Sequence, residues 1–189
     1  MDVAIMLYAG FRLLEASGPM DVFQEANRQC GRIVYEQHLV GPAPGPVVCS
    51  NGTAVGTTAS LADAPASFDI VVIPGSRFAG PEREHRELVD WLRETGYHAR
   101  KLATVSNGAF LLARAGLADR RWLVTHPGDA QRLANEHSRV NVLAGQHCVK
   151  DGNVYSADGV NAGIRLALAL VSEDLGQRVV ERIAKALLA

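Results

Sequence analysis

Three short apolar runs, each followed by a pattern typical of a helix, constrain the fold more than any other feature of this chain. The runs cover residues 3–8, 69–73 and 101–105 and contain few polar residues. Strands of this composition are buried on both faces, as in a parallel sheet that is covered by helices. Strands that alternate with helices build such a sheet. We therefore predict an α/β fold: a doubly wound, mostly parallel sheet with helices on both faces.

The segments around these strands carry capping and turn signals. Ser17 is predicted to cap a helix that ends near Arg28, with Pro19 and Asp21 in its first turn. Further helices are predicted over residues 82–95, 109–115, 129–136, 160–171 and 175–189, and further strands over residues 33–40, 122–124 and 140–143. Small antiparallel strands are predicted within residues 41–60, and a hairpin with its turn at residues 151–152. No repeat or linker divides the chain, which predicts a single domain over residues 1–189.

Composition and charge exclude several classes of protein. The chain has 19 Lys and Arg against 20 Asp and Glu, a net charge of −1, which argues against a polybasic nucleic-acid surface. No apolar run reaches the roughly 18 residues of a membrane span. The three cysteines are far apart and odd in number, which favours the reducing cytoplasm. The histidines do not cluster and no phosphate-binding glycine motif is present, so we expect neither a metal nor a cofactor.

Ligands of doubly wound sheets bind outside the carboxyl ends of the strands. Three loops qualify in this chain: residues 8–17, 74–79 and 105–108. We predict that the site is assembled from these loops.

Ser106 is the sharpest candidate, because a buried strand turns there directly into a helix. Such an elbow exposes its side chain near a helix N-terminus, where backbone N–H groups stabilise an oxyanion. Thr104 stands where a GxSxG hydrolase elbow has its first glycine, so the match to that motif is partial. The alternative is an ordinary turn whose serine caps the helix.

Glu15 and His126 are the other candidates. Glu15 follows the first strand in an apolar stretch, where a partly buried carboxyl would keep its proton more readily; the alternative is a solvated loop acid. His126 ends the strand at residues 122–124 and could complete a hydrolytic triad with Ser106 and an acid. The alternative for His126 is a structural histidine that bonds the backbone.

Taken together, five segments resemble the ThiJ/PfpI superfamily, relatives of the class I glutamine amidotransferases. They are residues 11–23 (FRLLEASGPMDVF), 69–75 (DIVVIPG), 105–117 (VSNGAFLLARAGL), 125–126 (TH) and 159–168 (GVNAGIRLAL). The resemblance implies a flavodoxin-like, glutamine amidotransferase-like fold. Two branches share these segments: isonitrile hydratase-like enzymes and the amidase-like N-terminal domain of AraC-type transcriptional regulators.

The chain departs from the superfamily at the elbow. Enzymatic members carry a cysteine there, usually followed by Thr-Gly, whereas this chain has Ser106, Asn107 and Gly108. A serine hydroxyl stays protonated and needs a positioned base. The family's Pro-Gly-Gly is Pro-Gly75-Ser76 here, and the N–H of Ser76 remains available in principle. The resemblance thus implies a pocket in which Gly75, Ser76, Asn107 and Gly108 bind a ligand or an oxyanion.

The resemblance favours a ligand-sensing, non-catalytic domain of an AraC-type regulator. A small polar or amide-bearing molecule would bind at Glu15, Ser76, Ser106, Asn107 and His126. The helical pattern still runs at Ala189 without a cap, as expected if a helix-turn-helix module follows and is absent from this chain. We expect a cytoplasmic homodimer that meets DNA only through that module and does not bind membranes. The alternative is a stand-alone isonitrile hydratase- or amidase-like enzyme that uses Ser106.

Overall fold

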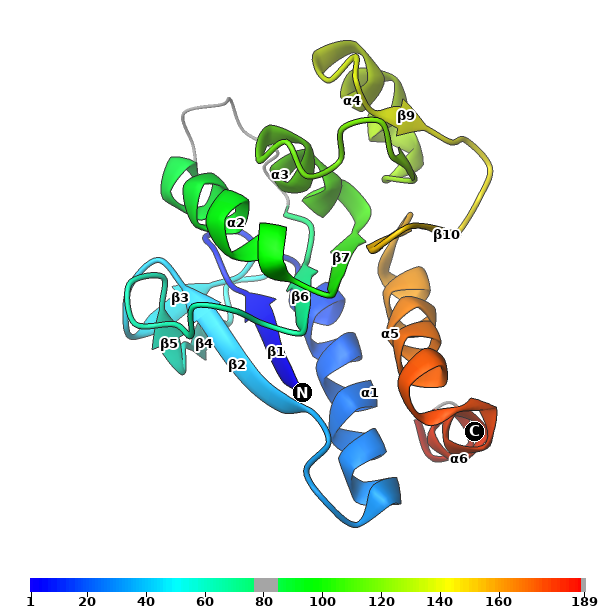
Figure 1. Ribbon diagram of the computed structural model, residues 1–189. Coiled ribbons are helices and arrows are strands. Elements are labelled where there is room, and N and C mark those ends of the chain that lie inside the picture. Colours follow the sequence, from blue (N-terminus) through cyan, green and yellow to red (C-terminus); the bar gives the residue numbers. More distant parts are fainter. Residues whose placement is uncertain (77–84, 188–189) are drawn as a thin grey trace.

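The computed structural model describes residues 1–76 and 85–187 (Figure 1). Seven strands form the main sheet in the order β10-β11-β7-β6-β1-β2-β5, and every neighbouring pair is parallel except β10 with β11. The strands are β1 (Asp2–Met6), β2 (Glu36–Gly41), β5 (Ala59–Ser60), β6 (Ile70–Ile73), β7 (Lys101–Val105), β10 (Cys148–Asp151) and β11 (Val154–Ala157). The predicted mostly parallel sheet is confirmed.

Helices cover both faces of this sheet (Figure 1). They are α1 (Leu13–Cys30), α2 (Arg86–His98), α3 (Ala109–Arg114), α4 (Ala130–Glu136), α5 (Val160–Leu175) and α6 (Gln177–Leu187). Helices α1, α5 and α6 pack against one another, and α2 packs against α3. The doubly wound arrangement follows from the sequence because the central strands have no polar face to expose. Ile5, Val72 and Ala103 lie side by side in register on β1, β6 and β7, and all three are buried.

The smaller predicted elements are also present, except that the turn of the hairpin between β10 and β11 lies at residues 152–153 and not at the predicted residues 151–152, because Asp151 still pairs with Val154. Strands β3 (Pro46–Val48) and β4 (Ala54–Gly56) pair antiparallel within the segment predicted to do so. Strands β8 (Trp122–Leu123) and β9 (Asn141–Val142) form a separate parallel pair. Within the described residues, no helix combines the length and the apolar composition that spanning a membrane requires. Residues 77–79 of one predicted site loop and the start of the predicted helix over residues 82–95 lie outside the described residues.

The predicted start of the first helix is wrong. Helix α1 begins at Leu13 with Arg12 as its N-cap, so Ser17 and Pro19 lie inside the helix. Proline there removes one helical hydrogen bond, which normally favours a helix that begins next to the proline, later than Leu13. Packing overrides this signal: a Cβ on Gly18 would lie 2.8 Å from Ile164 Cγ1 on α5, so the two helices approach closely at this turn. The early start is what brings Glu15 into a helix.

Candidate functional site

The elbow at Ser106 has a strained backbone. Strand β7 runs directly into a 3-10 turn, η1 (Ser106–Gly108), which continues as α3. Ser106 is buried and has φ 54°, in the left-handed region that non-glycine residues rarely adopt. The hydroxyl of Thr125 donates to the carbonyl oxygen of Ser106 at 2.9 Å and holds the turn from the neighbouring loop. The sequence therefore builds a true strand-to-helix elbow at this position.

Two glycines allow the backbone to close around this elbow. A Cβ on Gly108 would collide with the carbonyl oxygen of Ile73, a backbone atom that cannot rotate away. A Cβ on Gly75 would lie 2.5 Å from Asn107 Oδ1 and 2.6 Å from Glu15 Oε2. Both positions thus require glycine because the ends of β6 and β7 nearly touch.

Glu15 reaches into the site from the first turn of α1. Its carboxyl group is buried, and Oε2 accepts a hydrogen bond from the N–H of Gly75 at 2.7 Å. Burial raises the pKa of Glu15 to about 7, although the Gly75 N–H, the charge of Arg12 and the Ser106 hydroxyl act in the opposite direction. Oε1 has no hydrogen-bond partner among the described residues and lies 3.7 Å from Arg12 Nε. The alternative of a solvated loop acid does not fit this burial.

Asn107 and Ser76 bond each other. The N–H of Ser76 donates to Asn107 Oδ1 at 2.8 Å, and Asn107 Nδ2 donates to the Ser76 carbonyl oxygen at 2.9 Å. With the N–H of Gly75 bonded to Glu15, both N–H groups at the end of β6 have internal partners. A ligand could use them only by displacing a side chain, so the binding roles predicted for Gly75, Ser76, Asn107 and Gly108 stay predictions.

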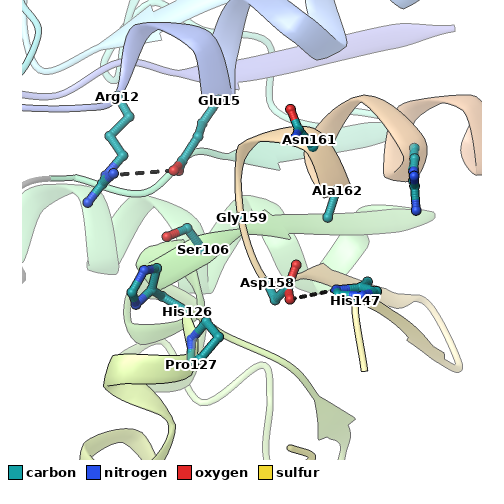
Figure 2. A pocket seen from close by; sticks show the side chains of 11 residues that line it. Arg12, Glu15, Ser106, His126, Pro127, His147, Asp158, Gly159, Asn161 and Ala162 are labelled. Atoms are coloured by element: carbon teal, nitrogen blue, oxygen red, sulfur yellow. Dashed lines mark hydrogen bonds and ion pairs between the residues drawn. The ribbon is translucent and has the colours of Figure 1, made fainter. Parts of the chain in front are cut away.

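His126 is exposed and begins a second 3-10 turn, η2 (Pro127–Asp129). Its Nδ1 accepts a hydrogen bond from the N–H of Gly128 at 3.1 Å. This local bond is the structural role that the sequence left open as an alternative. His126 nevertheless lines the same cavity as Ser106 (Figure 2). A catalytic role for it stays a prediction.

A cavity of about 510 Å³ opens above the elbow. Figure 2 shows Glu15 and Arg12 on one side, Ser106 and His126 beneath them, and a wall formed by Asp158, Gly159, Asn161 and Ala162. Eleven residues line it: Arg12, Glu15, Ser106, His126, Pro127, His147, Asp158, Gly159, Asn161, Ala162 and Arg165. The predicted residues Glu15, Ser106 and His126 thus meet in one cavity, whereas the other four predicted residues are not among those that line it.

The far wall of this cavity was not predicted as part of the site. His147 Nδ1 and Asp158 Oδ2 lie 2.9 Å apart, within hydrogen-bond distance, and Gly159 is the N-cap of α5, without a side-chain cap. The start of α5 therefore directs the positive end of a long helix dipole at the cavity. A signal was present, because residues 159–168 belong to the segments that carry the family resemblance.

The cavity offers no metal site in the part of the chain that the structure describes. Within residues 1–76 and 85–187, no three histidine, cysteine or acidic side chains come together. The arrangement can bind a polar molecule between α1, the elbow and α5.

The sequence of this chain is similar to a known family and to individual proteins. Residues 1–173 match the model of the DJ-1/PfpI family. The chain is 27% identical to isonitrile hydratase of Pseudomonas putida over 93% of this chain and 73% of that protein. It is 24% identical to the HTH-type transcriptional regulator GlxA of Rhizobium meliloti, over 96% of this chain and 55% of that protein.

A solved structure has the same fold. The crystal structure of an AraC family transcriptional regulator from Pseudomonas putida superposes with a TM-score of 0.86 at 24% identity, covering 98% of each chain. The chain spans about half the length of the curated HTH-type regulators that it matches. Because the family model covers almost the whole sequence, the chain belongs to the DJ-1/PfpI family.

Proposed function

We propose that this chain is the ligand-sensing, non-catalytic domain of an AraC-type transcriptional regulator. The observation that supports the proposal most strongly is the chemistry at the elbow. Its residue is a serine, and the N–H groups of Gly75 and Ser76 beside it donate to Glu15 and Asn107. An acyl-transfer site needs an activated nucleophile and free donors for the developing charge. Among the described residues, the pocket thus has a polar lining, but its elbow residue is a serine and both N–H groups at the end of β6 are already bonded.

The lining of the cavity favours a small polar ligand that bears a carboxylate or an amide. Arg12, Arg165 and the N-terminus of α5 present positive charge and N–H groups to a ligand oxygen. The raised pKa of Glu15, about 7, allows its side chain to hold a proton near neutral pH and to donate it to such an oxygen. Oε1 of Glu15, which has no hydrogen-bond partner among the described residues, adds an acceptor that a ligand donor can satisfy.

A ligand in this cavity would connect α1, the elbow and α5. Helices α1 and α5 pack against each other, so a bridging ligand would bias how they pack and what they present to a dimer mate or to a DNA-binding module. Relatives named HTH-type regulators align over 94–97% of this chain and are about twice as long, which supports the proposal. In this proposal the domain is a cytoplasmic homodimer, and DNA is contacted by the other half of the regulator.

The proposal is tested by ligand screening with matched variants. A library of small carboxylates and amides is screened by thermal shift, and hits are titrated by calorimetry. Ser106→Ala should leave the affinity within a few-fold, whereas Arg12→Gln should weaken it at least tenfold. The exposed Arg178→Gln on α6 is the control for lost charge. Consumption of a hit by the wild type, but not by Ser106→Ala, would contradict a non-catalytic role.

The regulatory half of the proposal has its own test. The natural gene is sequenced past the codon for Ala189. A reading frame that continues into two helix-turn-helix patterns with a basic excess supports the regulator. A stop codon directly after Ala189 counts against it.

A second candidate function is a hydrolytic or hydrating enzyme, and one observation favours it. Ser106 has the left-handed backbone of a reactive elbow, and the pKa of about 7 fits Glu15 as an acid-base group. Glu15 would accept the Ser106 proton while Oγ attacks the carbon of an isonitrile or amide. With an isonitrile, Glu15 returns the proton to that carbon, and water then hydrolyses the imidate on Oγ to a formamide. With an amide, Glu15 gives the proton to the departing amine, and water then hydrolyses the acyl ester to an acid and restores Ser106. The assay follows an alkyl isonitrile and a simple amide by mass spectrometry. Turnover that Ser106→Ala abolishes would establish this function, and no turnover with wild type or Ser106→Cys would exclude it for these substrates.

A further inference from the structure

A second cavity lies away from the elbow, between α2, α3 and the segment after α4. Its volume is about 530 Å³, close to that of the cavity at Ser106. Figure 1 shows α3 between α2 and α4 in this part of the molecule. The residues that line it are Arg86, Val89, Asp90, Arg93, Ala113, Arg114, Gly116, His137 and Arg139. The two cavities share no lining residue, so a ligand of one need not affect the chemistry of the other.

The lining of the second cavity concentrates positive charge. Of the nine described residues that line it, four are arginines and one, Asp90, is a carboxylate. Asp90 is shared by two arginines: Arg93 Nη1 lies 2.7 Å and Arg86 Nε 3.6 Å from its oxygens. Arg139 is held by Asp119 at 3.0 Å. Among the described residues, three of these four guanidinium groups thus share two carboxylates.

The arginines come from three separate segments, and the shape they form is concave. Arg86 and Arg93 lie on one face of α2, at positions i and i+7, while Arg114 ends α3 and Arg139 follows α4. Guanidinium groups bind phosphate and carboxylate oxygens in pairs and retain their charge at every physiological pH. A hollow of this size suits a small molecule, since a nucleic-acid backbone needs a cationic stripe along an open surface.

We propose that this cavity binds a small anion with two or more negative charges, such as a phosphorylated metabolite or a polycarboxylate. Arg93, from α2, and Arg139, from the segment after α4, hold the anion. Because Arg93 already contacts both Asp90 and the carbonyl oxygen of Arg114, its guanidinium is anchored at the wall and needs little reorganisation to bind. The site is independent of the proposed function at Ser106.

The experiment titrates the chain with inorganic pyrophosphate and, separately, with citrate at low ionic strength, by calorimetry and by amide NMR. The double variant Arg93→Gln/Arg139→Gln is compared with Arg32→Gln/Arg178→Gln, which removes the same charge from exposed positions elsewhere. The expected result is saturable binding by wild type and the control, at least tenfold weaker in the first variant, with shifted amides in α2 and α3. Arg12→Gln should bind as wild type does.

Three outcomes would overturn the proposal: saturable binding of neither anion, equal weakening in both double variants, or loss of binding in Arg12→Gln. Binding of pyrophosphate alone would identify the ligand class as phosphorylated, and binding of citrate alone as polycarboxylate. Both of these support the site.

Discussion

The two ends of the central sheet differ in how their buried charged residues are paired. At the amino end, Lys101 begins β7 and its buried Nζ contacts Asp174 of α5 at 2.9 Å and the Leu170 carbonyl oxygen at 3.2 Å. Asp174 also contacts Arg100 at 3.2 Å and the Tyr35 hydroxyl at 3.1 Å. At the carboxyl end, Glu15 keeps an oxygen without a hydrogen-bond partner among the described residues.

This difference separates stability from function. The amino end satisfies its buried charges with one another, which ties α5 to the sheet. The carboxyl end has a Glu15 oxygen without a hydrogen-bond partner among the described residues, a positive φ at Ser106 and a cavity of about 510 Å³. Strain and unsatisfied polar groups persist where the surrounding fold enforces them, and they mark functional sites. We therefore expect changes at the amino end to alter stability alone and changes at the carboxyl end to alter binding as well.

The largest effect is expected at the amino end. Lys101→Met removes the closest cation of Asp174 and leaves it paired with the more exposed Arg100. It should lower the free energy of unfolding by about 3–4 kcal/mol, because removing one partner of a buried pair is strongly destabilising. Ligand affinity at the elbow should not change. Urea denaturation measures the effect. Lys150→Met, which removes an exposed partner of Glu173, is the control and should have little effect. Equal losses in both variants would contradict the special role of the buried pair.

A large effect is also expected where the two strand ends touch. Gly108→Ala forces a Cβ against the carbonyl oxygen of Ile73 and should lower the free energy of unfolding by about 3 kcal/mol. It should also abolish binding at the elbow. Gly56→Ala on β4 meets no atom within 4 Å and serves as the control. If Gly108→Ala binds ligand as the wild type does, the close approach of β6 and β7 does not shape the site.

The pH dependence of stability sharpens the comparison further. The pKa of Glu15 rises from its ordinary value of 4.5 to about 7 on folding, so between these values the folded chain binds more protons than the unfolded chain. Its contribution is therefore lost as the pH rises from about 4.5 to about 7, by about 3 kcal/mol, and stays constant above that range. Denaturation of wild type and Glu15→Gln across this range isolates the effect. A difference between them that does not vary with pH would refute it.

The smallest effect concerns strain at the elbow. Ser106→Gly relieves the positive φ but frees the unfolded chain, so stability should stay constant or rise by at most about 1 kcal/mol. Ser172→Gly inside α5 has no strain to relieve and should lose about 1 kcal/mol. Thermal denaturation compares the two. A loss at Ser106 as large as the loss at Ser172 would mean that the elbow stores no strain.

Local patterns predicted most of the fold and the centre of the site. Apolar runs identified the central strands, and an abrupt strand-to-helix transition identified Ser106. Two features could not be predicted from the sequence, for physical reasons. The start of α1 at Leu13 depends on its packing against α5, which outweighs the proline signal. The cavity wall of His147 and Asp158 depends on a contact made only after β10, β11 and α5 have assembled.

The second cavity, between α2, α3 and the segment after α4, was not predicted for the same reason, because its arginines come from three separate segments.

The central claim is that the carboxyl end of the sheet binds a small ligand without converting it. NMR tests this directly, with amide spectra of the protein and proton spectra of an added library of small carboxylates and amides recorded in the same samples. We predict compounds that shift the amides of Gly75, Ser76 and Asn107 equally in wild type and Ser106→Ala, while the signals of the compounds persist unchanged. Conversion of a bound compound by the wild type, absent in Ser106→Ala, would contradict the account and establish an enzyme.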